Sequence, residues 1–71
     1  MSLAQCEIAK TTRILKIEGG RGIKSKLSAM GLVPGMEIKV LRSHNRGPMI
    51  IEVMDSRIML GHGMAAKIIV E

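Results

Sequence analysis

The chain is short, basic and free of aromatic residues, and these properties exclude several classes of protein. Its 71 residues suffice for a single domain spanning residues 1–71, and its 46% apolar content argues against disorder. No apolar run approaches the roughly 20 residues of a membrane-spanning helix, and the N-terminus lacks the features of a signal peptide, so we expect a cytosolic protein without membrane insertion. The single cysteine, Cys6, excludes an internal disulfide.

The net charge of +5 comes from eleven Lys and Arg residues against six acids. Such a balance permits contact with nucleic acid, an anionic membrane face or an acidic protein. The basic residues are spread along the chain, however, which is typical of ordinary surface charge. The absence of Phe, Tyr and Trp removes the stacking platforms that single-stranded bases require, and this argues against nucleic acid as a partner.

The first predicted strand is Thr11 to Ile17, which is rich in β-branched and aliphatic residues. Its facing is ambiguous, because Arg13 and Lys16 lie in opposite phases of the alternation. The segment Glu18-Gly19-Gly20 ends it.

Arg21 to Met30 predicts a short helix, because its apolar residues recur at i, i+4 and i+7. They are Ile23, Leu27 and Met30. Gly31 suits the left-handed position just past a helix end. Pro34-Gly35 suits the centre of a type II turn, with φ preset by proline and a positive φ allowed by glycine. A helix stop, a turn and a strand start therefore follow one another closely.

Apolar and polar residues alternate in the second half of the chain, as they do in short strands with one buried face, and the pattern predicts four such strands. The residues expected to face inward are Ile38, Val40, Ile51, Val53, Ile58, Leu60, Ile68 and Val70. We expect a loop at residues 44–48, a hairpin link at Asp55-Ser56 and a single helical turn near residues 64–66. About five strands with one short helix predict a mainly β fold, a small, partly open barrel.

The alternation leaves four apolar residues on the outward face. They are Leu41, Ile50, Met54 and Ile69. In so small a domain, four such residues on neighbouring strands could form a contact patch. Alternatively, bending strands and chain ends could cover them.

Two segments, together with Leu27 between them, carry a distinctive pattern: Ile14-Leu15-Lys16-Ile17-Glu18-Gly19-Gly20 and Met30-Gly31-Leu32-Val33-Pro34-Gly35-Met36-Glu37-Ile38. They resemble the FeoA family, whose members are small accessory proteins of bacterial ferrous iron transport. The closing half of the chain fits the family as well, through Gly47-Pro48-Met49-Ile50, Ile58-Met59-Leu60 and Met64-Ala65-Ala66-Lys67-Ile68-Ile69-Val70. The resemblance implies an SH3-like barrel that binds a membrane Fe²⁺ permease carrying a cytosolic GTP-binding domain, at the inner face of the membrane.

The chain departs from the family pattern before its first strand. Family members often carry Pro-Gly where Ile8-Ala9 stands here, so we expect the first turn to differ. A leucine is common at the position of Cys6, which favours a packing role for this thiol.

No catalytic, cofactor or metal site is predicted. The serines lack a base and an orienting partner, and Cys6 has no neighbouring histidine. The iron connection makes transition-metal binding worth testing, but His44 and His62 are isolated, with no second ligand at a helical spacing. Folding could still bring His62 near Glu52 or Glu71 to form a weak surface site.

The candidate functional surface is an apolar groove with a basic rim beside the predicted helix. Its predicted partner-binding residues are Lys24, Leu27, Met30, Leu32 and Val33. The apolar side chains would supply affinity and the lysine would steer an acidic partner. Burial of Ile23, Leu27 and Met30 against the barrel is the competing interpretation, and we expect Ile23 to be in the core. A homo-oligomer, a nucleic-acid-binding barrel and a stand-alone relative of the SH3-like domain of metal-dependent repressors remain alternatives.

Overall fold

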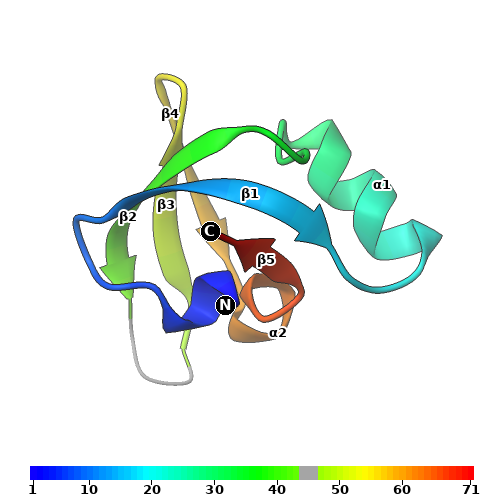
Figure 1. Cartoon of the computed structure of the whole chain (residues 1–71), viewed down its shortest axis with the longest axis horizontal. Coiled ribbons are helices and arrows are strands. Elements are labelled where there is room, and N and C mark those ends of the chain that lie inside the picture. The colour runs from blue at the N-terminus through cyan, green and yellow to red at the C-terminus, as the bar shows by residue number, and fades with distance from the viewer. Residues whose placement is uncertain (44–46) are drawn as a thin grey trace.

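The computed structural model describes residues 1–43 and 47–71, whose strands form one antiparallel sheet that wraps around an apolar interior (Figure 1). The strands are β1 (Thr11–Ile17), β2 (Glu37–Ser43), β3 (Met49–Val53), β4 (Ser56–Leu60) and β5 (Ile68–Val70). The helical segments are the 3₁₀ turn η1 (Leu3–Gln5), the helix α1 (Arg21–Ala29) and the short α2 (His62–Ala65). The spatial order is β4-β3-β2-β1-β5. The predicted mainly β fold of five strands is confirmed, and residues 44–46 of the predicted loop lie outside the described residues.

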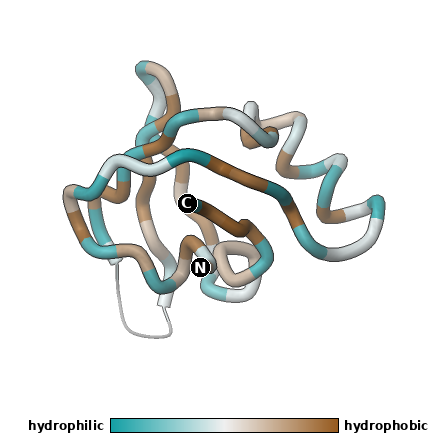
Figure 2. The backbone as a smooth tube through the Cα atoms, viewed as in Figure 1, coloured by the Kyte–Doolittle hydropathy of each residue, from teal (hydrophilic) through white to brown (hydrophobic). Residues whose placement is uncertain are grey.

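The interior of the sheet contains a single apolar cluster, to which all five strands contribute. Seven of the eight residues expected to face inward are at most 4% exposed, and Ile58 is half-buried. The apolar colour of β5 at the centre of Figure 2 marks this interior. Leu3 is 0% exposed, although no pattern in the sequence predicted that the N-terminus lies in the core. The η1 turn brings it there, and Ser2 bridges to Ile69 on β5.

A bulge in β1 explains why its facing could not be decided from the alternation. Ile14 pairs with Val70, but the next pair on the ladder is Lys16 with Ile69, so Leu15 is the extra residue. A bulge of this kind shifts the alternation by one position. Thr12 and Ile14 are buried before it and Ile17 after it, while Leu15 and Lys16 both face solvent. Both charged residues of the strand therefore point outward.

A second bulge, between Val40 and Arg42 on β2, separates the four outward apolar residues. Leu41 and Ile50 share one hollow, whereas Met54 lines a different one. Ile69 is half-buried under the N-terminal segment. The idea of one patch made of all four is wrong, because the bulge and the chain terminus place them in three different surroundings.

The C-terminus of α1 has the geometry that its sequence predicts. The amide of Gly31, with φ of +87°, donates to the carbonyl of Ser28 at 2.9 Å, and the amide of Leu32 donates to the carbonyl of Leu27 at 2.9 Å. This pair of bonds is the Schellman motif, which satisfies carbonyls left free at a helix end. The type II turn follows directly: Gly35 has φ of +93°, and the Met36 amide donates to the Val33 carbonyl at 3.1 Å.

The hairpin link between β3 and β4 is Met54-Asp55, not Asp55-Ser56. Val53 pairs with Ser56, so the two residues between them make the turn. Met54 takes φ of +57°, in the left-handed region that favours glycine. The prediction was wrong because the strand register, which the local sequence does not set, decides which two residues form the turn.

The first turn of the chain keeps the shape expected of a Pro-Gly pair, although Ile8-Ala9 occupies it. The amide of Lys10 donates to the carbonyl of Glu7 at 3.3 Å, and Ala9 takes φ of +70°. A positive φ at the third residue is the mark of a type II turn. The expectation of a different turn is therefore wrong. The amide of Ala9 donates to the Val40 carbonyl at 2.7 Å, and this tie to β2 holds the alanine in a strained conformation.

Replacing Ala9 with glycine should raise the free energy of unfolding by about 1 kcal/mol, because glycine adopts a positive φ without the Cβ penalty. Urea denaturation at equilibrium measures the change. Gly35→Ala is the mirror control and should lower stability, since it places a Cβ at φ of +93°. An Ala9→Gly protein no more stable than the parent would show that this turn is not strained.

Candidate partner-binding site

A groove of about 310 Å³ lies between α1, the end of β1 and the turn that leads into β2. Its lining residues are Lys16, Ile17, Lys24, Ser28, Leu32, Val33 and Pro34. We call it the α1 groove. Most of its lining is apolar, and lysines from two different elements stand at its rim. Val33 is half-buried and Pro34 is exposed, so these two side chains offer the accessible apolar surface.

The structure places three of the five predicted binding residues in this groove. Lys24, Leu32 and Val33 line it, whereas Leu27 and Met30 do not. Leu27 is 0% exposed and points into the barrel, so the prediction that it contacts a partner is wrong. Met30 is half-buried and packs against the core, as does Ile23, which the sequence placed there. Leu32, also 0% exposed, supports the groove floor from beneath.

The contribution of β1 to the groove was not predicted from the sequence. Lys16 and Ile17 line it from the end of β1, where they follow the bulge at Leu15 and pair with β5. The sequence did contain a sign of this bulge. Arg13 and Lys16 would face opposite sides of a regular strand, and a bulge is the simplest way for both charged side chains to face solvent. Ser28 and Pro34 were missed because the sequence already accounts for them, Ser28 as a polar residue of the helix and Pro34 as the turn proline.

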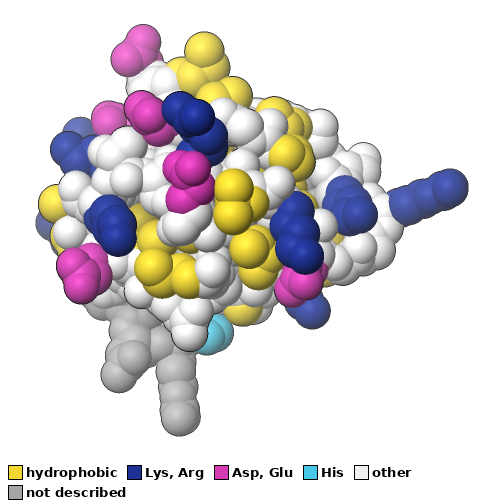
Figure 3. Space-filling view, in the orientation of Figure 1, with side chains coloured by type: hydrophobic (Ala, Val, Ile, Leu, Met, Phe, Trp, Pro, Cys, Tyr) yellow, Lys and Arg dark blue, Asp and Glu magenta, His cyan; other side chains and the backbone are white. Residues whose placement is uncertain are grey.

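The electrostatic character of the rim is basic. Lys and Arg side chains gather at the end of the molecule where α1 lies (Figure 3). Lys16 Nζ lies 3.9 Å from a carboxylate oxygen of Glu18, but both side chains are more than half exposed, so this pair is weak. Lys24 forms no ion pair with any residue in the described ranges. The groove therefore presents an apolar floor with positive charge on both sides.

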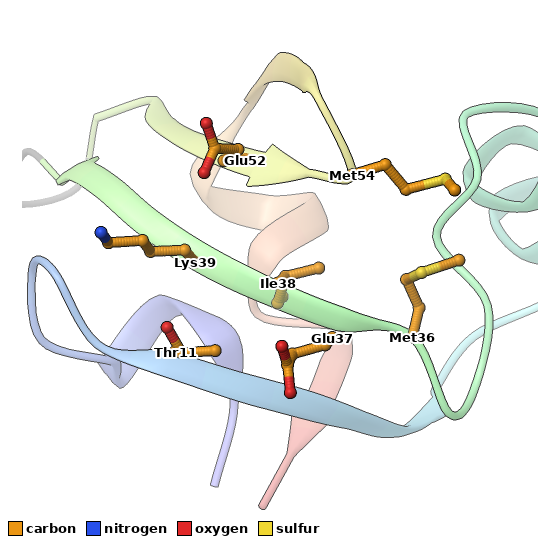
Figure 4. Close-up of a pocket in the computed structure, with 7 residues that line it drawn as sticks. All are labelled: Thr11, Met36, Glu37, Ile38, Lys39, Glu52 and Met54. Carbon is orange, nitrogen blue, oxygen red and sulfur yellow. The ribbon is translucent and has the colours of Figure 1, made fainter.

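A second hollow, of about 330 Å³, crosses the outer face of β1, β2 and β3 (Figure 4). Its lining residues are Thr11, Met36, Glu37, Ile38, Lys39, Glu52 and Met54. Figure 4 shows the two methionines at one end and the charged side chains along the strands. Acidic and basic groups alternate there, and Glu37 already pairs with Arg13 at 3.8 Å. Because this lining carries two carboxylates and one lysine, and because the lining of the α1 groove is more apolar, we favour the α1 groove as the binding site.

The chemistry needed for catalysis is not assembled among the residues that the structure describes. No serine or cysteine in these ranges is hydrogen-bonded to a histidine, and no three His, Cys, Asp or Glu side chains come together as metal ligands would. His62 is exposed at the start of α2, and His44 is outside the described residues. No helix in residues 1–43 or 47–71 is long and apolar enough to cross a membrane.

Cys6 is a packing residue, as its sequence context predicts. It is 5% exposed within the apolar cluster, and burial raises the pKa of its thiol. A raised pKa keeps the thiol protonated and unreactive near neutral pH. The only free cysteine of the chain is therefore not a functional group of the α1 groove.

The fold places this chain in the class of small SH3-like barrels, here with an apolar, basic-rimmed groove beside its helix. Comparison with known proteins specifies the family: residues 1–71 match the FeoA domain. A protein of Methanocaldococcus jannaschii, provisionally named Fe(2+) transport protein A, is 43% identical over 58 residues, which cover 82% of this chain and 70% of that protein. The chain belongs to the FeoA family.

Solved structures agree with this assignment. The crystal structure of an iron uptake regulatory protein, FeoA, has a TM-score of 0.94 and 37% identity, covering 99% of this chain and 93% of that one. The FeoA of Stenotrophomonas maltophilia in complex with zinc, described as a prokaryotic SH3 domain protein, has a TM-score of 0.85. It is 18% identical and covers 100% of this chain and 89% of that one, so it supports the SH3-like fold alone.

Proposed function

We propose that this chain is an accessory protein of ferrous iron uptake that acts by binding a protein partner, without catalysis of its own. The partner is the cytosolic side of a membrane Fe²⁺ permease that carries a GTP-binding domain, and binding modulates the assembly or activity of that permease. The chain then works at the inner face of the membrane through its partner. The family membership and the transport names of the relatives support the iron connection.

The observation that carries the binding role is the α1 groove itself. Apolar side chains that are accessible in a concave surface give affinity, because partner atoms can displace water from them. Lys16 and Lys24 at the rim attract an acidic segment and orient it before contact. The segment that fits this lining has one or two apolar side chains for the floor and a carboxylate beside them.

Isothermal titration calorimetry with the cytosolic region of the permease tests the proposal. We expect saturable binding that weakens, but persists, as salt rises from low to physiological concentration, because the apolar contact is not screened. Absence of binding to the permease region at both salt concentrations would refute the proposal.

A nucleic-acid-binding barrel is the competing function, and the +5 net charge is the observation in its favour. Titration calorimetry with RNA and with duplex DNA separates this function from binding to a protein partner. If the protein partner is correct, the nucleic acids should bind only at low salt, as non-specific adhesion does. Sequence-selective binding at micromolar concentration in physiological salt would instead favour nucleic acid. The missing aromatic residues argue against that outcome.

A further inference from the structure

One edge of the sheet is unpaired within the described residues, and it belongs to β4. The strand order β4-β3-β2-β1-β5 places β4 and β5 at the two ends of the sheet. The N-terminal segment covers β5, since Ser2 bridges to Ile69 and the Val70 amide donates to the Met1 carbonyl at 2.8 Å. No backbone hydrogen bond from the rest of the described chain reaches residues 56–60 on their far side.

The hairpin geometry identifies which backbone groups are free. A two-residue link closes on a hydrogen-bonded pair, here Val53 with Ser56, and bonded pairs then alternate along an antiparallel ladder. Ile58 and Leu60 therefore bond to β3. Arg57 and Met59 turn their amides and carbonyls away from it. Two donors and two acceptors point outward from a strand with no proline, no lysine and no bulge to protect it.

The side chains on this edge favour a particular kind of occupant. Arg57 is exposed and Met59 is 67% exposed, so an added strand would place one side chain opposite each of them. Arg57 also lines a hollow of about 300 Å³ with Leu41, Arg42 and Ile50. Neither guanidinium lies within 4.0 Å of any carboxylate in the part of the chain that the structure describes. The edge thus combines apolar surface with two guanidinium groups, and Glu52, the cross-strand neighbour of Arg57 on β3, does not lie within ion-pair distance of either.

We propose that β4 binds an extended segment of a partner protein as an additional antiparallel strand, and that this segment carries an acidic residue opposite Arg57 and an apolar residue opposite Met59. Backbone bonds to Arg57 and Met59 give affinity, and the two side chains set the register and select the sequence. Ile58, which is half-buried between them, offers an apolar contact on the inner side. A second copy of this chain fits less well, because each copy carries a net charge of +5. The α1 groove shares no residue with this edge, so the proposal does not rest on the proposed function.

The probe that tests strand addition is the peptide acetyl-Thr-Leu-Val-Glu-Thr-amide, with its Glu meant to lie opposite Arg57. In the free protein, the amides of Arg57 and Met59 should exchange with solvent quickly while those of Ile58 and Leu60 are protected. On titration, nuclear magnetic resonance should show the largest shifts at residues 57–59. N-methylation of the peptide Leu or Glu should abolish binding, and N-methylation of the Val, whose amide points away from β4, should not.

Charge exchange tests the selectivity. Arg57→Glu should lower the affinity for the peptide about three- to tenfold. A peptide with Lys in place of Glu should recover that loss when it binds the Arg57→Glu protein. Lys26→Glu, on α1, makes the same change in net charge and should have almost no effect. Protection of the Arg57 and Met59 amides in the free protein, or equal binding of all N-methylated peptides, would overturn strand addition. If the protein instead self-associates through residues 57–59 as its concentration rises, the strand that binds β4 belongs to a second copy of this chain, and the proposed partner segment is wrong.

Discussion

Replacing Leu27 with aspartate should unfold the protein. Leu27 is 0% exposed and belongs to the apolar cluster, although the α1 groove lies beside it. Removal of a buried leucine side chain costs about 2–5 kcal/mol, and burying an unpaired carboxylate adds several more. A domain of this size has only about 3–5 kcal/mol of stability in total. Far-UV circular dichroism and urea denaturation should therefore find no cooperative transition.

Ser25→Asp provides the matched control for that substitution. Ser25 is exposed on the same helix and outside the groove lining, so the same carboxylate should leave the fold intact. A Leu27→Asp protein that folds with parental stability would show that α1 does not dock through Leu27. Because unfolding alone removes binding, Leu27 cannot report on the partner surface, and another groove residue is needed for that purpose.

Val33→Asp should weaken binding to the permease region at least about tenfold while the fold persists. Val33 is half-buried in the groove lining and follows the Schellman motif, so its side chain contributes accessible surface rather than core volume. The new carboxylate would remain partly hydrated in the free protein, but a docked apolar segment would desolvate it. Titration calorimetry measures the affinity, and circular dichroism verifies the fold.

Ile8→Asp is the control for the groove substitution. Ile8 is 57% exposed in the first turn and lines none of the hollows described above, so the same change should leave affinity within about twofold. Equal losses from Val33→Asp and Ile8→Asp would indicate a non-specific effect of charge. Full affinity in a folded Val33→Asp protein would exclude the groove as the contact surface.

The sequence predicted the elements of this fold well because local physics decides them. Thr11–Ile17 is the strand that its β-branched content predicts, and α1 ends where Gly31 allows a left-handed residue. The alternation identified the inward residues of the later strands, since one face of each strand must be buried. Those signals depend on a few neighbouring residues and require no knowledge of which strands pair.

Features set by long-range pairing were not predictable in the same way. The bulges beside Leu15 and Leu41 depend on the partner strands, and so does the hairpin turn at Met54. Ala9 holds a positive φ because its amide is tied to Val40, about thirty residues along the chain. Leu3 reached the core for the same reason, because the N-terminal segment adds to β5.

The candidate site combines both kinds of information. Lys24, Leu32 and Val33 could be found from the helix and the turn that follows it, since one short segment of chain carries them. Leu27 was misplaced because the apolar stripe of a helix does not by itself distinguish core from groove. The β1 side of the groove required the bulge. The free edge of β4 required the strand order, which no local pattern in residues 56–60 contains.

Amide chemical-shift mapping of the complex with the permease region tests most directly whether this FeoA-family protein works through the surface beside α1. We predict that the largest changes on adding the unlabelled permease region fall at the amides of the groove lining, with smaller effects elsewhere. These amides belong to Lys16, Ile17, Lys24, Ser28, Leu32 and Val33. A saturable complex whose shift changes leave those residues untouched would contradict the account.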